Sequence, residues 1–183
     1  MRASRARRWG ECALTGAWRV GRGQRRPGPR GDTLGDVIYV DGTALCRFLP
    51  GVRYFEEWNA WVVPRVREVV TTQLGLTELR QAAELYPRET KAKAFDVVEV
   101  VRSRMPLIRF SDENVTVSTH AAAVLKPFAA LHLGAAVAHP AIDTIATYDV
   151  ELARVAALYE LRIVTPGLPE GWHNGTGAAP HGG

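Results

Sequence analysis

The sequence predicts an α/β fold in which helices cover both faces of a central, mostly parallel sheet of four to five strands. Short β-branched runs alternate with amphipathic stretches between residues 37 and 166. Strands that alternate with helices need crossover connections, and these make neighbouring strands parallel. The length of 183 residues fits one domain with short tails. We find no internal repeat, which argues against a solenoid.

The strands are predicted where β-branched and aromatic residues cluster between turn-forming residues. The first run, Val37 to Val40, ends at Asp41-Gly42-Thr43, which is typical of a turn. Further strands are predicted at 69–71, 107–110, 142–147 and 162–164.

The helices are predicted where apolar residues recur every three or four positions and where capping residues or prolines mark the ends. Thr72 and Ser111 are candidate N-caps, and Pro127 falls at the first turn of a helix, where proline is tolerated. The predicted helices cover residues 43–49, 55–62, 72–83, 94–101, a segment from 111, 127–139 and 149–159.

The charge is concentrated in the first segment of the chain. Residues 1–36 contain nine arginines and three acidic residues, a net charge of +6, and the remaining 14 basic and 16 acidic residues give −2. We expect residues 1–36 to be a disordered basic extension; the alternative is an over-extended gene start. We expect residues 37–167 to form the domain and residues 168–183 to be a disordered Gly/Pro-rich tail.

Composition excludes two classes of protein. No apolar run approaches the roughly 18 residues of a membrane span, so we expect no membrane association. The two cysteines, Cys12 and Cys46, are too few for a disulfide scaffold, and a cytoplasmic location is the simplest expectation.

Three carboxylates are expected at one edge of the predicted sheet. Asp41 follows the first strand, Asp149 follows residues 142–147, and Glu78 lies early in the helix after the second strand. Ligands of open parallel sheets bind outside the carboxyl ends of the strands. Clustered carboxylates repel each other unless a cation binds them, and Mg²⁺ prefers oxygen ligands. The pattern therefore predicts a metal-dependent phosphodiesterase.

Each of these acids also has an ordinary structural explanation. Asp41 before Gly42 is typical of an Asx turn, Asp149 is positioned to cap a helix, and Glu78 could be a solvated helical acid. His132 could contact a substrate phosphate or the acids, but a buried and hydrogen-bonded histidine is the more common case. The joint position of the acids favours a site only if the predicted topology is correct.

Four segments resemble the motifs of PIN-domain proteins, and the similarity extends over residues 37–167. These segments are Val37-Ile38-Tyr39-Val40-Asp41, Thr77-Glu78-Leu79-Arg80, Ala146-Thr147-Tyr148-Asp149 and Arg162-Ile163-Val164-Thr165. They look most similar to the VapC-like toxin ribonucleases of bacterial toxin–antitoxin pairs. The resemblance implies a PIN-like three-layer α/β/α sandwich, RNA cleavage that depends on Mg²⁺ or Mn²⁺, a homodimer, and neutralisation by a cognate antitoxin protein.

The resemblance also assigns roles to individual residues. It implies that Asp41, Glu78 and Asp149 bind the metal and are catalytic, and that Thr147 orients metal-bound water. Ala129 occupies the position of the family's third acid, because Ala130-Leu131-His132 match the residues that follow that acid. Glu151, two residues after Asp149, is a candidate substitute ligand. Gly42 stands where the family has Thr or Ser, so one possible side-chain hydrogen bond is lost at this position.

The missing acid leaves two functions open. One is a PIN-type metal-dependent endoribonuclease with impaired cleavage. Losing even a residue that only hydrogen-bonds to a metal ligand costs about 10–100-fold in metal affinity or activity. The other is a catalytically weak or inactive PIN-fold protein that binds a partner protein or RNA. The Asp-Gly-Thr sequence also occurs in haloacid-dehalogenase-like phosphatases, but Tyr39 stands where those enzymes have their nucleophile.

Overall fold

The computed structural model describes residues 37–175, so the extension expected at 1–36 and the tail residues 176–183 lie outside the described part. A central sheet contains strands β1 (Val37–Val40), β2 (Val69–Val70), β3 (Ile142–Ala146) and β4 (Arg162–Val164). The helices are α2 (Gly42–Leu45), α3 (Phe55–Val62), α4 (Gln73–Glu84), α5 (Arg88–Arg104), α6 (Asp112–Ala121), α7 (Pro127–Val137) and α8 (Val150–Leu158), with 3₁₀ turns η1 (Cys46–Phe48), η2 (Val63–Arg65) and η3 (Trp172–Asn174).

The four strands are parallel and lie in the order β2-β1-β3-β4, which confirms the predicted fold class. Val40, the last residue of β1, pairs with Ala146, the last residue of β3. Since both strands end at the same level, the residues that follow them lie side by side. This register brings Asp41 next to the segment that begins at Thr147.

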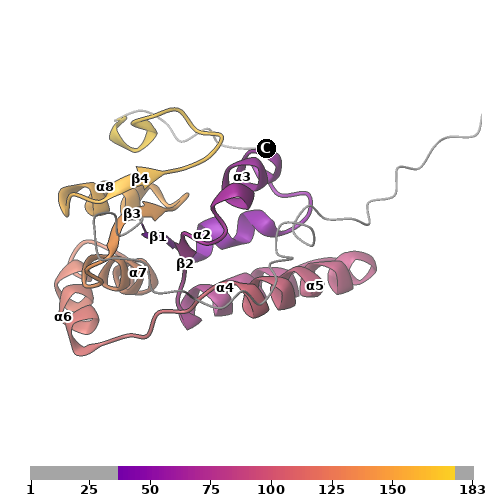
Figure 1. The fold of residues 1–183 in the computed structure, drawn as a ribbon, viewed down its shortest axis with the longest axis horizontal. Coiled ribbons are helices and arrows are strands. Elements are labelled where there is room, and N and C mark those ends of the chain that lie inside the picture. The colour runs from indigo at the N-terminus through magenta and orange to yellow at the C-terminus, as the bar shows by residue number, and fades with distance from the viewer. Residues whose placement is uncertain (1–36, 176–183) are drawn as a thin grey trace, which may run out of the picture.

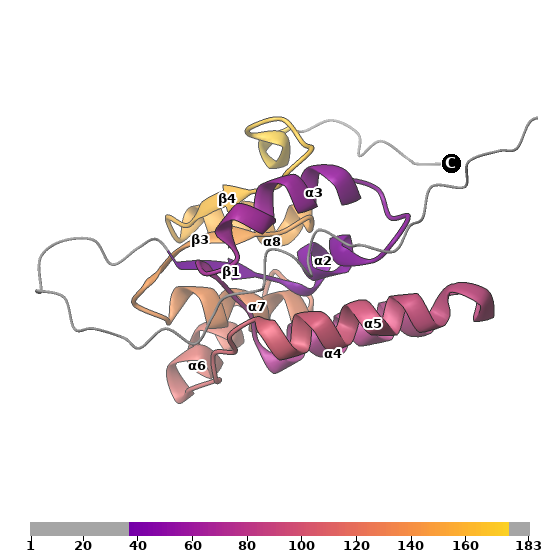
Figure 2. The same ribbon diagram turned by 45° about the vertical axis from the view of Figure 1, so that its right-hand side comes forward.

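Alternate residues of β1 face two separate hydrophobic cores. Ile38 and Val40 pack into a core formed with α2, α3, α4 and α5, in which Trp58 is fully buried. Tyr39 points to the other side, into a core formed with α6, α7 and α8. Figure 2 shows α3 and α7 on opposite sides of β1, and Figures 1 and 2 show α5 lying along α4. The sheet is thus covered on both faces, as expected.

The prediction of a strand at residues 107–110 is wrong. The chain forms a single parallel bridge between Thr71 and Leu107, and Ile108 donates its N–H to the carbonyl of Thr71 at 2.9 Å. Leu107 and Phe110 are exposed, so the segment has no buried face to hold it in a longer ladder. Pro106 supplies no N–H, but its carbonyl accepts from Thr71.

Residues 168–175, expected to be part of a disordered tail, are folded onto the domain. The indole N–H of Trp172 donates to the Thr165 hydroxyl at 2.9 Å, and the Arg154 guanidinium donates to the carbonyls of His173 and Gly175 at 2.6 and 2.8 Å. His173 is buried. Aromatic packing and the bonds from Arg154 thus outweigh the Gly/Pro-rich composition. Between residues 37 and 175, no helix is long and apolar enough to cross a membrane.

Helices α6 and α7 pack closely because residue 134 has no side chain. A Cβ at Gly134 would lie 2.1 Å from the hydroxyl oxygen of Ser118 and 2.3 Å from the backbone oxygen of Asn114. Asn114 donates from its amide to the carbonyl of Gly134 at 3.0 Å, which joins the two helices at this contact. The position of α7, which carries Ala129 and His132, is thus fixed against α6.

We predict that Gly134→Ala lowers the free energy of unfolding by about 1–3 kcal/mol, because the added methyl group meets backbone as well as a side chain. Urea unfolding followed by circular dichroism measures this difference. Gly175→Ala is the control, since a Cβ there would meet its nearest atom at 3.8 Å. Equal stability of the two variants would show that α6 and α7 can separate without cost.

An acidic pocket at the carboxyl ends of β1 and β3

Asp41 is the most enclosed acid of the predicted site. Its exposed fraction is 1%, and four hydrogen bonds reach its two carboxylate oxygens. The backbone N–H of Ala44 and the hydroxyl of Thr43 donate to Oδ1, both at 2.8 Å, because Asp41 is the N-cap of α2. The Thr147 hydroxyl donates to Oδ2 at 2.7 Å, and Thr43 also reaches Oδ2 at 3.0 Å. A buried carboxylate is tolerated only with such donors.

The donors do not fully compensate for burial. Burial raises the pKa of Asp41 above its ordinary value, because the charged form loses its hydration. His132 and the hydrogen bonds from Thr147, Ala44 and Thr43 act in the opposite direction. Asp41 is therefore a carboxylate held in the pocket at an energetic cost, which is typical of functional positions.

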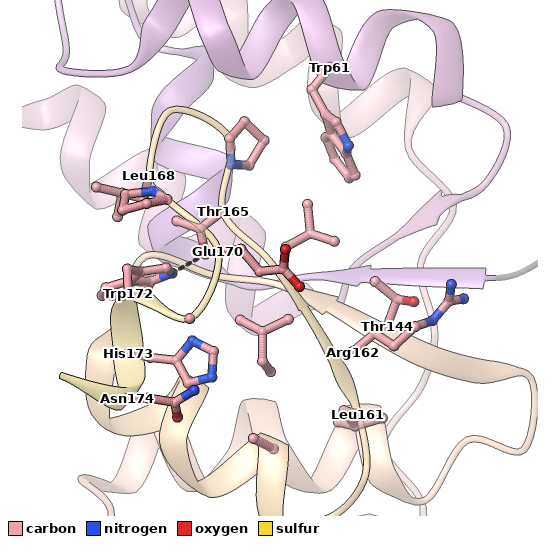
Figure 3. Close-up of a pocket in the computed structure, with 16 residues that line it drawn as sticks. Trp61, Thr144, Leu161, Arg162, Thr165, Leu168, Glu170, Trp172, His173 and Asn174 are labelled. Carbon is pink, nitrogen blue, oxygen red and sulfur yellow. Dashed lines mark hydrogen bonds between the residues drawn. The ribbon is translucent and has the colours of Figure 1, made fainter.

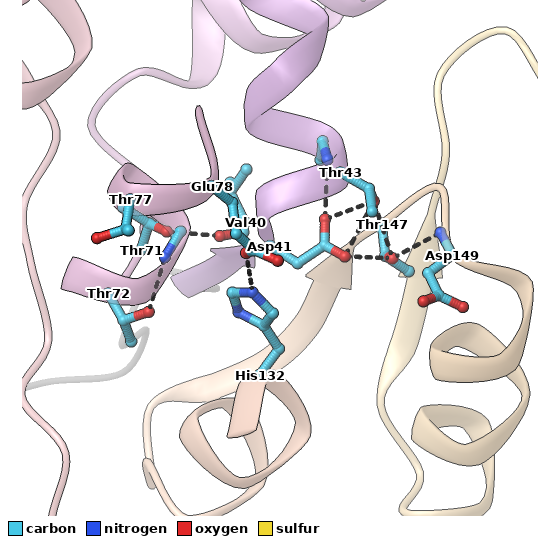
Figure 4. A network of polar contacts seen from close by, with 12 residues as sticks. Val40, Asp41, Thr43, Thr71, Thr72, Thr77, Glu78, His132, Thr147 and Asp149 are labelled. Carbon is cyan, nitrogen blue, oxygen red and sulfur yellow. Dashed lines mark hydrogen bonds and ion pairs between the residues drawn. The ribbon is translucent and has the colours of Figure 1, made fainter. Parts of the chain in front are cut away.

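Thr147 connects the end of β3 to both neighbouring acids (Figure 4). Its hydroxyl donates to Asp41 and accepts the backbone N–H of Asp149 at 3.0 Å. Asp149 in turn caps α8: its Oδ1 accepts the backbone N–H groups of Glu151 and Leu152 at 2.9 and 3.1 Å. The carbonyl of Thr147 accepts from Thr165, which holds this segment to the end of β4.

Glu78 approaches from the other side of the pocket and contacts His132. Its Oε2 lies 2.5 Å from Nε2 of His132, whose Nδ1 lies 2.7 Å from the hydroxyl of Tyr39. Tyr39 is fully buried and also lies 3.2 Å from the hydroxyl of Thr72, the N-cap of α4. This chain of contacts joins α4, α7 and β1, and Figure 4 shows Glu78 and His132 facing each other.

Gly42 gives Glu78 the space for this position. A Cβ at Gly42 would lie 2.0 Å from Oε2 and 2.5 Å from Cδ of Glu78. From the sequence, Gly42 was expected only to remove a hydrogen bond that a Thr or Ser side chain could make. In the structure, the absence of a side chain lets the Glu78 carboxylate lie against the turn after β1. The hydroxyl expected there comes from Thr43, one residue later.

The acids line one cavity of about 340 Å³, a size suited to a small ligand or to part of a larger one. Its polar lining comes from the three acids and from His132. Apolar and basic side chains of α7, its N-cap and α8 form the rest of the wall: Lys126, Pro127, Phe128, Ala129 and Leu152.

A larger cavity of about 640 Å³ lies around β4 and contains none of these acids. Trp61, Thr144, Glu170, Trp172 and His173 are among its lining residues, and Figure 3 shows them arranged on both sides of the strand. It is formed largely by the segment 165–174 as this folds over the edge of the sheet. We take the smaller cavity as the candidate site, because the buried carboxylate of Asp41 and the half-buried carboxylates of Glu78 and Asp149 line it.

The structure brings most predicted site residues together. Asp41 and Thr147 are in direct contact, and Asp41, Glu78 and Asp149 share the cavity. Glu151 does not line the cavity and is exposed in the first turn of α8. Asp149 and His132 also have the structural roles considered for them: Asp149 caps α8, and His132 is buried and hydrogen-bonded. Asp41, for which an Asx turn was considered, is the N-cap of α2.

The residues present do not fit a three-ligand metal site. Within residues 37–175, no three Asp, Glu, His or Cys side chains lie close enough together to hold a metal ion. Both oxygens of Asp41 already accept hydrogen bonds, Oε2 of Glu78 contacts His132, and Oδ1 of Asp149 caps α8. Ala129, which the sequence resemblance places where a third acid was expected, has only a methyl group as its side chain, and the residue is 8% exposed.

Sequence reasoning missed the roles of Tyr39 and Thr43 in the site. Tyr39 is a polar group at a buried position of a strand, and Thr43 was expected only to begin a helix. Thr72 was predicted as an N-cap, which the structure confirms, but its contact with Tyr39 was not predicted. A hydroxyl in the middle of an otherwise aliphatic central strand is the one signal that could have identified Tyr39. Nothing in the spacing indicates that Tyr39, 93 residues away, contacts His132.

The sheet order, the two covered faces and the acidic pocket at the carboxyl edge define a PIN-like α/β fold. Among solved structures, the chain is similar to one described as FitAcB from Neisseria gonorrhoeae, with a TM-score of 0.52 and 15% sequence identity. The match covers 69% of this chain and 96% of that chain. No protein-family model and no curated protein sequence matches the chain. The similarity shows the fold alone.

We predict that Asp41→Asn stabilises the protein at pH 8 and that this gain disappears as the pH approaches 4. The folded-state pKa of Asp41 is raised, so the folded protein binds the proton more tightly than the unfolded chain. Its contribution therefore falls as pH rises from the ordinary pKa of 3.8 through the folded pKa. Each unit of raised pKa corresponds to about 1.4 kcal/mol.

Urea unfolding of both proteins between pH 4 and pH 8, in EDTA, measures this difference. Asp143→Asn is the control: desolvation acts to raise the pKa of that carboxyl, but the hydrogen bonds from Thr144 and Arg162 and the charge of Arg162 together lower it. The contribution of a lowered pKa is lost only below the ordinary value of 3.8, so this substitution should change stability by a nearly constant amount between pH 4 and pH 8. A gap between Asp41→Asn and the original protein that stays constant with pH would contradict the burial argument.

Proposed function

We propose that this chain is a toxin-type ribonuclease of the PIN class whose own cleavage activity is strongly impaired. The PIN-like fold and the motifs around Asp41, Glu78 and Asp149 support the class, and the shared cavity supports the location of the site. RNA as substrate, Mg²⁺ or Mn²⁺ as cofactor, a homodimer and an antitoxin partner are parts of this proposal.

The observation that carries the proposal is the methyl group at position 129. Ala129 lines the same cavity as the three acids but supplies no oxygen. A divalent ion at a phosphodiester would activate water and stabilise the developing charge. The chain's own contribution is the pair of carboxylates, Asp41 held by Thr43 and Thr147, and Glu78 held by His132. Without a third oxygen, we expect weak metal binding and correspondingly weak cleavage.

We predict that Ala129→Asp creates or increases Mg²⁺-dependent cleavage of RNA by at least about 10-fold, the lower end of the loss expected from one missing partner. Ala129 is on α7 one turn before His132 and faces the cavity, so the new carboxylate points into the pocket. Cleavage of a fluorescently labelled RNA pool, with and without EDTA, is the measurement.

Two further variants make the result specific. Ala129→Asn has nearly the same shape without the charge and should not gain activity. Ala129→Asp combined with Asp41→Asn should lose the gain, because the pocket then lacks its most buried acid. Equal cleavage by the original chain and by Ala129→Asp, both dependent on Asp41, would overturn the assignment of Ala129 as the cause of impairment.

A second candidate function is the binding of a partner protein without cleavage. Both carboxylates and hydrocarbon line the cavity, and one of the lining residues, Phe128, is 52% exposed. Such a surface suits a basic side chain with an aliphatic stem, such as an arginine of an antitoxin-like partner. Ala129 does not weaken this interaction, because it adds to the hydrocarbon wall.

For this candidate we predict copurification with the product of a small neighbouring gene, without RNA degradation. Phe128→Ser should weaken the complex, while Val115→Ser, an exposed apolar residue on α6, should leave it unchanged. Isothermal titration of the purified partner into each variant gives the affinities. Equal affinities for both variants would place the partner on another surface.

A further inference from the structure

We propose that Tyr39 and His132 are positioning residues that hold Glu78 in the pocket by a hydrogen-bond relay that needs no metal ion. The proposal rests on the proposed function only in that Glu78 belongs to the reactive pocket. Tyr39 does not touch Glu78; it contacts Nδ1 of His132, and His132 contacts Glu78 through Nε2. Both residues are buried, with exposed fractions of 0% and 3%.

The proposal assigns a direction to each hydrogen bond, with Glu78 ionised and His132 neutral. An ionised carboxylate only accepts hydrogen bonds, so Nε2 of His132 must carry the proton that faces Glu78. In a neutral imidazole the other nitrogen, Nδ1, is then an acceptor, and the hydroxyl of Tyr39 is its donor at 2.7 Å. Burial raises the pKa of Tyr39, so the phenol keeps its proton for this bond.

The remaining member of the relay is Thr72. Its hydroxyl oxygen accepts the backbone N–H of Gly75, and its own proton can be donated to the oxygen of Tyr39, 3.2 Å away. The order of donation is thus Thr72 to Tyr39, Tyr39 to His132, and His132 to Glu78. This order satisfies every buried polar group in the series, as the low dielectric of the interior requires.

The relay determines which carboxylate oxygen of Glu78 is held by His132. Oε2 is held by His132, and the missing side chain of Gly42 leaves room for that oxygen beside the turn after β1. The carboxylate is thereby compensated by the protein itself, in a pocket where Ala129 has removed one metal ligand. Loss of the Tyr39 hydroxyl should release His132 and, through it, Glu78.

The first test determines by ¹⁵N NMR which ring nitrogen of His132 carries the proton. The full chain, labelled at histidine and measured in EDTA, should contain one neutral imidazole with the proton on Nε2 and Nδ1 accepting a hydrogen bond. His132→Gln assigns the signal. An imidazolium, or a proton on Nδ1, would overturn the proposal.

The second test moves Glu78 without altering the relay residues. Gly42→Ala places a methyl group where Oε2 lies, so the Nε2–H proton of His132 should lose its protection from exchange. In Gly175→Ala the signal should persist, since that site is open. Persistence of the signal in Gly42→Ala would overturn the claim that Glu78 is the partner in solution.

The third test separates a relay from independent structural roles. If Tyr39 acts through His132 on Glu78, the double variant Tyr39→Phe/Glu78→Gln should have a urea midpoint close to that of the worse single variant. Tyr148→Phe also removes a tyrosine hydroxyl near the site, one that donates to Pro166, and should combine additively with Glu78→Gln. Additive shifts in the Tyr39 pair would overturn the relay.

These outcomes are independent of the cleavage experiment. The NMR and stability measurements use the chain in EDTA, without RNA. A relay that behaves as expected, together with no gain of cleavage by Ala129→Asp, would remove the ribonuclease proposal and leave the relay. Cleavage gained by Ala129→Asp with the other histidine tautomer would remove the relay and leave the ribonuclease.

Discussion

The burial of the Asp41 carboxylate is the constraint on which the site depends. It lies at the end of a central strand with 1% of its surface exposed, so the chain must supply donors from several elements. The first turn of α2 supplies Ala44 and Thr43, and the end of β3 supplies Thr147. The parallel register of β1 and β3 makes this possible, because it ends both strands at one level.

Much of the fold could be predicted because hydrophobic periodicity reports burial directly. The β-branched and aromatic run of β1 and the apolar spacing in α4 and α8 correspond to residues that the structure does bury. The predictions fail in two segments where the amino-acid composition does not match the burial of the residues. Residues 107–110 have strand-forming side chains but remain largely exposed, and residues 168–175 are rich in Gly and Pro but are held by Trp172 and Arg154.

The site could be predicted only in outline. The rule that ligands bind at the carboxyl ends of parallel strands located Asp41, Glu78 and Asp149 correctly in one cavity. It could not give the orientation of each carboxylate, which depends on donors far away in the chain. His132 meets Glu78 across 54 residues and Tyr39 across 93, and no local pattern encodes such distances.

The close contact of α6 and α7 has a consequence for how this protein can change. Gly134 lets the two helices touch, because a Cβ at that position would collide with Ser118 and with the backbone of Asn114. The same helix carries Ala129, whose methyl group lines the cavity between the helices and the carboxyl ends of the strands. A larger side chain at position 129, which one codon change can supply, would therefore project into that cavity from a helix already held in place.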